Sequence, residues 1–342
     1  TRYIGVTGVQ TCALPISRVP GRPVPGDPED RLVRWGRMHE TVEAVVEQGC
    51  DLIHVQTPFV AHYAGCATAK RYGVPVIATY HTLFEEYLKH YAPLLPAGLL
   101  CGLARRFSRR QCNALDAVIV PSRAIEQRLG AYGVTTPMEI LPTGIPLARF
   151  SKGDGSAFRQ RHGISADRPL ALYVGRVAHE KNIGFLIEAF AEAIRHSPDA
   201  LLLVTGEGPA MDDLRRQAAR LGLEASVRFL GYLDRERDLP DCYAAATLFV
   251  FASRTETQGL VLIEALAAGT PVVALAAMGT ADILADAPGC IAAPDEPGAF
   301  GRIVGTLLAD PPACLALAEQ APATAAGWSD TAMAGRLADF YR

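Results

Sequence analysis

Apolar and polar positions alternate along the chain in blocks from Arg31 onward. Apolar residues three and four apart predict a helix, and the short continuous apolar runs between such blocks predict buried strands. The apolar positions of the first predicted helix are Leu32, Trp35, Val42, Val45 and Val46; strands are predicted at 52–55, 76–78, 117–120 and 138–141, and helices end near Leu115 and Tyr132. Helices that alternate with apolar strands predict a parallel sheet covered on both faces.

A second series of the same kind follows a polar segment at 145–156, which is rich in glycine towards its end. We place a domain boundary there, after residue 150. Its predicted strands are 171–174, 201–204, 227–230, 248–251 and 272–275, and Asn182 can cap a helix between the first two. The predicted fold class is α/β, with two tandem Rossmann-like doubly wound domains facing a cleft, residues 31–150 and 151–327. Ligands of such sheets lie beyond the carboxyl ends of the strands, so functional residues are expected in the loops there.

The first 30 residues do not fit this pattern. They contain no initiator Met, no basic region followed by an apolar stretch, and many prolines, so a signal peptide does not fit. The run GVQTCALPIS, 8–17, looks like translated sequencing adaptor fused to an incomplete reading frame, and a natural irregular leader is the alternative. We therefore expect residues 1–30 to be an irregular leader and the first domain to be incomplete.

Composition and charge narrow the class of protein. The chain has 342 residues, 49% of them hydrophobic, and a formal net charge of −3, which predicts a soluble globular protein and argues against nucleic acid as a partner. The 8 cysteines are scattered without zinc-binding spacing, as in a reduced, cytoplasmic protein. The longest apolar stretch, 260–280, contains Glu264 and is cut by Pro271, so we expect no transmembrane helix.

Two cations follow a predicted strand end. Arg176 comes directly after Gly175 at the end of strand 171–174, and Lys181 lies at the entrance to the next helix. Arg and Lys in these positions could clamp a diphosphate through charge-assisted hydrogen bonds. A pair of solvated surface cations is the alternative, and spacing alone does not separate the two.

Glu256 and Glu264 flank a point where a loop turns into a helix. Gly259 between them allows close backbone approach, and the free N–H groups of a helix start can bind phosphate or sugar oxygens. Glu264 lies one turn into an otherwise apolar helix, where a carboxylate needs a partner, and a ribose diol would be one. A glutamate that faces solvent at the helix edge is the alternative.

Three further patterns are less specific. Gly206, Glu207 and Gly208 follow a strand, but Met211 stands where a dinucleotide fingerprint has its third glycine, so nicotinamide binding has little support. His81 ends a strand and could contact a polar substrate, although a lone histidine is more often structural. A predicted helix at 101–113 carries a basic cluster that could rest on anionic lipid or simply be solvated: Arg105, Arg106, Arg109 and Arg110.

Taken together, these motifs resemble a known family. The segments VGRVAHEKNIGFLIEAF (174–190), TGEGP (205–209), FLGYL (229–233) and SRTETQGLVLIEALAAGTPVVA (253–274) resemble the donor-binding half of the GT-B glycosyltransferases of family 4. In the first domain, HVQTPF (54–59), TYHTLFEEYLKHY (79–91) and ILPTGIPLARF (140–150) are similar to the subgroup that glucosylates diacylglycerol and related lipids. The resemblance covers residues 31–342.

The resemblance implies a role for each candidate residue. Arg176 and Lys181, with Gly175, Glu207 and Gly208 around them, would bind the donor diphosphate, and Glu264 the ribose hydroxyls. Glu256 and the backbone of Gly259, Leu260 and Val261 would bind the donor sugar, and His81 would lie beside it. Residues 328–342 would form a helix that crosses back to the first domain.

The resemblance also implies the reaction. Such an enzyme transfers a hexose with retention of anomeric configuration, here from UDP-glucose, to a lipid or glycan acceptor. No D-x-D triplet occurs in the chain, which fits transfer without a metal or other cofactor. A cytoplasmic location, with peripheral contact at the inner face of the membrane through the basic cluster, would follow.

One departure qualifies this expectation. Family members begin with a strand and a Gly-rich loop, and no motif before Arg31 matches either, so we expect weak or no activity from this chain. A nucleotide-sugar-binding protein without turnover and an epimerase of UDP-N-acetylglucosamine with the same fold are the alternatives.

Overall fold

The computed structural model describes residues 17–24, 27–81, 83 and 97–342, and the chain forms two compact units. Unit 1 extends to Pro142 and includes Arg336–Arg342, while unit 2 comprises Thr143–Gly335. The division therefore lies before Thr143 rather than after residue 150. The polar segment belongs to unit 2 because its short helices α6 (Leu147–Phe150) and α7 (Gly155–Arg161) bury Phe150 and Phe158 there.

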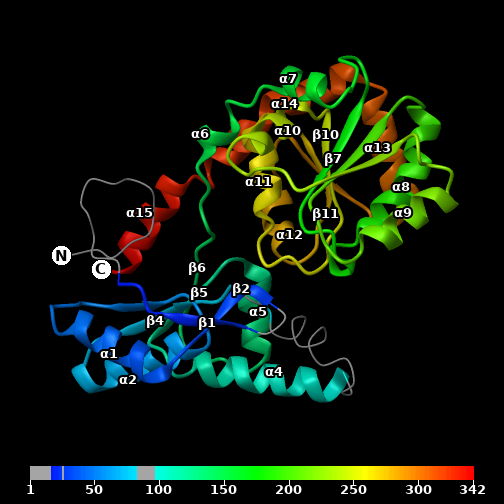
Figure 1. Ribbon diagram of the computed structural model, residues 1–342. Helices are drawn as coiled ribbons and strands as arrows, with labels where there is room; N and C mark the ends of the chain where they lie inside the picture. Colours follow the sequence, from blue (N-terminus) through cyan, green and yellow to red (C-terminus); the bar gives the residue numbers. More distant parts are fainter. Residues whose placement is uncertain (1–16, 25–26, 82, 84–96) are drawn as a thin grey trace. The chain divides into compact units, whose positions relative to one another are not determined.

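Unit 1 contains a four-stranded parallel sheet with the order β3-β4-β5-β6, of which β4, β5 and β6 are labelled in Figure 1. Its strands are β3 (Ile53–Val55), β4 (Val76–Thr79), β5 (Ala117–Val120) and β6 (Met138–Ile140), and its helices are α1 (Trp35–Val46), α2 (Val60–Tyr72), α4 (Ala97–Cys112) and α5 (Arg123–Ala131). The four strands predicted for the first domain are confirmed. Residues of β4 and β5 pack with Leu337 and Phe340 from the end of the chain, so the last residues complete this core.

The start of the described chain differs from the sequence prediction. Strands β1 (Gly21–Val24) and β2 (Asp27–Val33) form an antiparallel hairpin, so an irregular leader up to residue 30 is wrong for this part. Leu32 lies on β2, paired with Arg22, and its side chain is exposed, because the strand ladder takes the place of the predicted helix start. Helix α1 begins at Trp35, and of its predicted apolar face only Val46 is buried.

Unit 2 contains a six-stranded parallel sheet with the order β12-β11-β10-β7-β8-β9. Its strands are β7 (Leu170–Val174), β8 (Leu201–Thr205), β9 (Val227–Gly231), β10 (Leu248–Phe251), β11 (Val272–Leu275) and β12 (Cys290–Ala293). The five strands predicted for this domain are confirmed, and β12 was not predicted. Every residue of β7, β8, β10 and β11 is buried, as expected for strands covered on both faces.

Helices cover both faces of this sheet (Figure 1). Helices α8 (Ile183–His196), α9 (Met211–Arg220) and α13 (Pro297–Leu308) lie on one side, and α10 (Asp238–Ala245), α11 (Leu260–Ala267) and α14 (Pro311–Ala326) on the other. A short 3₁₀ helix, η1 (His179–Lys181), precedes α8, and α12 (Gly279–Leu284) follows β11. Within the part of the chain that the structure describes, no single helix is long and apolar enough to cross a membrane; α13 and α14, bent by 96° to each other, meet that test only as a pair.

The last helix, α15 (Asp330–Phe340), passes from unit 2 into unit 1. Before it begins, the chain pairs with the first residues of unit 2: the Ile145 N–H donates to the Trp328 carbonyl at 3.0 Å, and the Asp330 N–H donates to the Ile145 carbonyl at 2.9 Å. The two segments of unit 2 nearest its boundaries with unit 1, at Ile145 and at 328–330, therefore lie side by side.

Candidate functional site

The strand order of unit 2 contains one reversal, between β7 and β10. The chain runs from β7 outward to β8 and β9 on one side and from β10 outward to β11 and β12 on the other. The loops that leave the carboxyl ends of β7 and β10 therefore diverge, and the crevice between them is where doubly wound sheets bind ligands. Gly175 and Arg176 follow β7, and the segment from Ser253 to Gly259 follows β10, so the predicted donor residues lie at this point.

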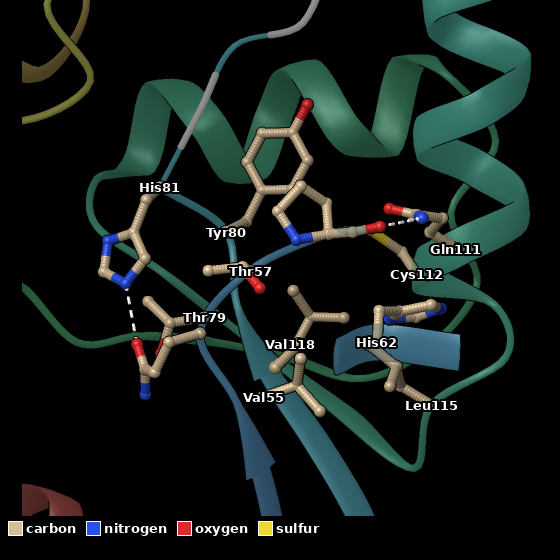
Figure 2. A pocket seen from close by; sticks show the side chains of 13 residues that line it. Val55, Thr57, His62, Thr79, Tyr80, His81, Gln111, Cys112, Leu115 and Val118 are labelled. Carbon is tan, nitrogen blue, oxygen red and sulfur yellow. Dashed lines mark hydrogen bonds between the residues drawn. The ribbon is translucent and has the colours of Figure 1, made fainter. Parts of the chain in front are cut away.

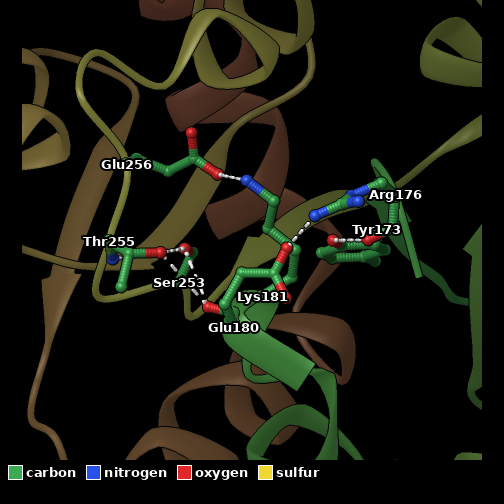
Figure 3. Close-up of polar contacts among 7 residues, drawn as sticks. All are labelled: Tyr173, Arg176, Glu180, Lys181, Ser253, Thr255 and Glu256. Carbon is green, nitrogen blue, oxygen red and sulfur yellow. Dashed lines mark hydrogen bonds and ion pairs between the residues drawn. The ribbon is translucent and has the colours of Figure 1, made fainter. Parts of the chain in front are cut away.

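The two predicted cations are each paired with a carboxylate (Figure 3). The ammonium of Lys181 lies 2.6 Å from Oε1 of Glu256, and both side chains are about one-fifth exposed. Arg176 pairs with Glu180 one turn on, and most of its guanidinium is open to solvent. The structure thus brings Lys181 and Glu256 together from positions 75 residues apart, while the motif had assigned Glu256 to the donor sugar and had not singled out Glu180.

The β7 and β10 loops are held to each other through η1. The hydroxyls of Ser253 and Thr255 both donate to the carbonyl of Glu180 at 3.4 Å, and the Asn182 side-chain amide donates to the Ala252 carbonyl at 3.0 Å. Asn182 adopts a left-handed φ of 56° and does not cap α8 with its side chain, contrary to the prediction. Its side chain instead fixes the end of β10.

The glycines after β8 permit a close contact with the β7 loop. A Cβ on Gly206 would lie 2.0 Å from the Gly175 carbonyl oxygen, and one on Gly208 would lie 2.3 Å from the Val177 carbonyl oxygen. The Val177 N–H donates to the carbonyl of Glu207 at 2.8 Å, so the two loops are joined through the backbone. This contact, rather than a dinucleotide fingerprint, accounts for the Gly-Glu-Gly sequence, and the Glu207 side chain is exposed.

Helix α11 begins at the crevice with Gly259 in a left-handed conformation, φ 91°. The N–H groups of Gly259, Leu260 and Val261 belong to this helix start, where backbone donors lack helical partners. The loop before it is fixed on both sides, because the Gly279 N–H donates to the Glu256 carbonyl at 2.9 Å and Gln258 pairs with Thr143. Because this loop holds the start of α11 in place, the free N–H groups there can bind an anion.

The Gln258 side chain makes two hydrogen bonds with one residue. Its amide accepts from the Thr143 N–H at 3.0 Å and donates to the Thr143 carbonyl at 2.9 Å, and only 5% of Gln258 is exposed. The first residue of unit 2 is therefore attached to the loop that precedes α11. Sequence reasoning missed this contact because nothing in the spacing of the two residues indicates it.

Glu264 is buried, with 1% of the residue exposed, so a solvent-facing glutamate is excluded. Its carboxylate accepts a hydrogen bond from the Tyr243 hydroxyl at 2.9 Å and pairs with Arg235 at 2.5 Å. Burial raises the pKa of Glu264, and Arg235 and Tyr243 oppose that shift. The protein thus supplies the partners that a carboxylate in this helix needs. A bound ribose would contact the Glu264 carboxylate together with Tyr243 and Arg235. The sequence pointed to neither of these two residues.

His81 lies in unit 1 and lines a pocket beyond the ends of β3 and β4 (Figure 2). Its Nε2 is 2.8 Å from Oε1 of Gln56, and partial burial lowers the pKa of the imidazole. The pocket is lined by apolar side chains together with polar ones, among them His62, Tyr80 and Gln111. Most of the motif 79–91 lies outside the described residues.

The basic cluster lies on α4, and all four arginines are exposed. The guanidinium of Arg105 is 5.7 Å from the ring centre of Tyr132. Arg106 and Arg110 are one turn apart and share a helix face with Leu103, of which 52% is exposed. This face of α4 therefore presents two cations and one apolar side chain to solvent.

Comparisons with known proteins give a family for both parts of the chain. The family model described as Glycosyl transferases group 1 matches residues 154–324, and the model described as Glycosyltransferase Family 4 matches residues 8–149. The second match starts well before Arg31, where the motifs had given no resemblance.

Individual relatives are similar over most of the chain. The alpha-monoglucosyldiacylglycerol synthase of Streptococcus pneumoniae is 34% identical over 253 residues, which are 72% of this chain and 56% of that protein, so the chain spans just over half of this relative's length. The D-inositol 3-phosphate glycosyltransferase 2 of Catenulispora acidiphila is 34% identical over 319 residues, 87% of this chain and 72% of that protein.

A solved structure has the same fold. The crystal structure of HepE from Anabaena in complex with UDP superposes with a TM-score of 0.75 and 23% identity, covering 88% of this chain and 81% of that one.

Proposed function

Because the chain belongs to the group 1 glycosyl transferases of family 4 and has the GT-B fold, we propose that it transfers glucose from UDP-glucose to a lipid hydroxyl, with retention of configuration and without a metal. The observation that carries the proposal is the grouping of Arg176, Lys181 and Glu256 at the strand-order reversal of unit 2. Cations and a helix start at one crevice suit a nucleoside diphosphate and its sugar. The name of the pneumococcal relative supports an α-linked glucosyl group on diacylglycerol.

Under this proposal each donor-side residue has the role that the family resemblance implies. Arg176 and Lys181 bind the diphosphate beside the backbone of Gly175 and Gly208, and Glu256 holds Lys181 and accepts from the sugar hydroxyls. Glu264 binds the ribose hydroxyls, with its carboxylate oriented by Tyr243 and Arg235.

The proposed reaction is the retaining transfer that the family resemblance implies, and the charge of this site suits it. The bond between the anomeric carbon and the diphosphate oxygen breaks with its electron pair on the diphosphate, whose growing charge Arg176, Lys181 and the α11 N–H groups stabilise. The acceptor oxygen bonds to the anomeric carbon on the face that the diphosphate leaves, and the hydroxyl proton passes to the diphosphate. We propose that His81 contacts a hydroxyl of the bound substrates.

Contact with a membrane is the second part of the proposal. The face of α4 that carries Leu103, Arg106 and Arg110 fits the surface of an anionic bilayer, because the leucine can enter the interface while the arginines meet lipid phosphates. The protein would then work at the cytoplasmic face of the membrane, where its acceptor lies.

Calorimetric titration with UDP and with GDP tests the donor site. We expect UDP to bind more tightly than GDP, and Lys181→Ala and Glu264→Ala each to weaken UDP binding about 10-fold or more. Lys152→Ala is the matched control, since Lys152 is an exposed lysine of the same unit outside the crevice. Binding of neither nucleotide by the folded chain, or equal loss in the control, would contradict the assignment.

Product analysis tests the chemistry. Incubation with UDP-glucose and diacylglycerol in anionic vesicles should give an α-glucoside by NMR, at a low rate that EDTA leaves unchanged. UDP binding without any transfer would instead identify a binding protein, and a new nucleotide sugar formed without acceptor would identify an epimerase.

Vesicle flotation tests the membrane surface. The double variant Arg106→Ala/Arg110→Ala should lose flotation with anionic vesicles at low salt. Arg216→Ala/Arg220→Ala on α9 removes the same charge from an exposed helix of unit 2 at the same spacing and should float as the unaltered chain does. Equal flotation of both double variants would refute this surface.

A further inference from the structure

Hydrogen bonds connect His81 to the opposite end of the chain. From His81, the contacts run to the Gln56 amide at 2.8 Å and from that amide to His54 Nε2 at 3.0 Å. His54 Nε2 is also 2.7 Å from the Thr79 hydroxyl, and His54 Nδ1 is 2.5 Å from the hydroxyl of Tyr341. All five side chains belong to unit 1.

The Gln56 amide is oriented with its nitrogen toward His54 and its oxygen toward His81, and this orientation determines where the protons lie. An amide NH₂ only donates, so His54 Nε2, which faces the nitrogen of Gln56, must be the unprotonated acceptor. The His54 proton is therefore on Nδ1 and is donated to Tyr341. Oε1 of Gln56 only accepts, so the atom that faces it, Nε2 of His81, must carry a proton.

The electrostatics agree with two neutral rings. Burial and the neighbouring His81 lower the pKa of His54 to about 4, and burial also lowers the pKa of His81. A second proton on His54 would place an N–H against the amide donor of Gln56, which the geometry opposes. Among the residues that the structure describes, the titratable groups that face His54 are His81 after β4 and Tyr341 after α15.

We propose that Gln56 and His54 are positioning residues that hold His81 in its neutral Nε2–H form, so that an unprotonated Nδ1 accepts the hydrogen bond of a substrate hydroxyl. We call this hydrogen-bonded series of Tyr341, His54, Gln56 and His81 the relay. Tyr341 holds its far end, and each of the four side chains orients the next. The role at a hydroxyl rests on the proposed function, but the proton positions do not. Gln56 sets them because one end of its amide donates and the other accepts.

Nitrogen-15 NMR of histidine side chains tests the relay directly, since the two tautomers have distinct ring-nitrogen shifts. In the unaltered chain we expect Nε2–H for His81 and Nδ1–H for His54. Gln56→Glu presents only acceptor oxygens, so His54 should change to Nε2–H or become doubly protonated, while Gln56→Leu should leave both rings as tautomer mixtures. His62 lines the same pocket outside the relay and is the internal control, whose signals should stay unchanged.

Kinetics then separates positioning from a purely structural role. Gln56→Leu should lower kcat roughly 10-fold with little change in KM for the donor, and UDP binding should be unaffected. Nδ1–H on His81 in the unaltered chain, or an unchanged His54 tautomer in Gln56→Glu, overturns the relay. The expected tautomers in a chain that binds UDP but transfers no sugar would contradict the proposed function and leave the relay standing.

Discussion

The two units hold their functional side chains by different means. In unit 2, the crevice lies at the end of fully buried strands, and its loops are fixed by backbone contacts at glycines and by ion pairs such as Lys181–Glu256. In unit 1, strand β3 has only three residues, and His81 is held by a series of side chains that ends at Tyr341.

The difference shows how each site should respond to change. A site fixed by a packed backbone loses one contact when one side chain is replaced, because its other residues remain in position. A site fixed by linked side chains responds as a group, because each hydrogen bond orients the next. The predictions below test this contrast.

The largest effect is expected at the glycine contact of unit 2. Gly206→Ala would place a Cβ 2.0 Å from the Gly175 carbonyl oxygen at a left-handed φ, so we expect a loss of about 3 kcal/mol in the free energy of unfolding, with weaker nucleotide binding. Gly222→Ala is the control: it shares a positive φ, but the described residues leave its Cβ open space, so about 1 kcal/mol is expected. Urea unfolding measures both, and similar losses would show that the contact is not essential.

Two tyrosine hydroxyls allow a direct comparison of the units. Tyr243→Phe removes a buried hydrogen bond to the Glu264 carboxylate and should cost about 2 kcal/mol, whereas Tyr341→Phe removes a half-buried bond to neutral His54 and should cost about 1 kcal/mol. Hydrogen exchange of the strand amides should locate the first loss in unit 2 and the second in unit 1. Only Tyr341→Phe should also alter the nitrogen-15 signals of His81; if those signals stay unchanged, unit 1 is not linked as described.

The attachment of Gln258 to Thr143 should contribute less. Gln258→Ala leaves the Thr143 N–H and carbonyl without these partners, and water can replace part of the loss, so we expect about 1 kcal/mol. Gln258→Glu keeps the acceptor but places a carboxylate oxygen against the Thr143 carbonyl in a buried site, so it should cost at least as much as the alanine variant. Faster exchange of the Thr143 amide in the alanine variant would identify the contact; an unchanged rate would argue against it.

The smallest effect is a pH dependence from Glu264. Since burial raises its pKa in the folded chain, the group binds its proton more tightly when folded, and its stabilising contribution is full below the ordinary glutamate pKa and is lost as pH rises through the raised value. Relative to Glu264→Gln, the unaltered chain should therefore lose stability as pH increases above about 4.5, by less than about 1.4 kcal/mol per pH unit. Urea midpoints from pH 4 to 7 measure this, and a difference that grows in the opposite direction would show that Arg235 dominates.

Most of the fold could be predicted from the sequence, because buried strands leave a local signal. The strands from β3 to β11 were all predicted, since each is a short apolar run between helical blocks. Leu32 was misassigned because its apolar side chain fitted a helix period, whereas the strand pairing of β2 with β1 depends on a partner that periodicity does not show.

The site was predictable only in part. Arg176, Lys181 and Glu256 follow strand ends, so their arrival at one crevice could be inferred from topology. Their pairing could not, and neither could the contacts of Glu264 with Tyr243 and Arg235, because those partners come from other elements 21 and 29 residues away. The distance along the chain is greatest for His54 and Tyr341, which are 287 residues apart.

The passage of α15 into unit 1 has a consequence for synthesis. Domains generally fold in the order in which the ribosome produces them. Here Leu337, Phe340 and Tyr341 complete the core and the hydrogen bonds of the unit that is made first. While unit 2 is being translated, the core of unit 1 lacks these side chains, and its packing is completed only after the residues beyond Gly335 have been added.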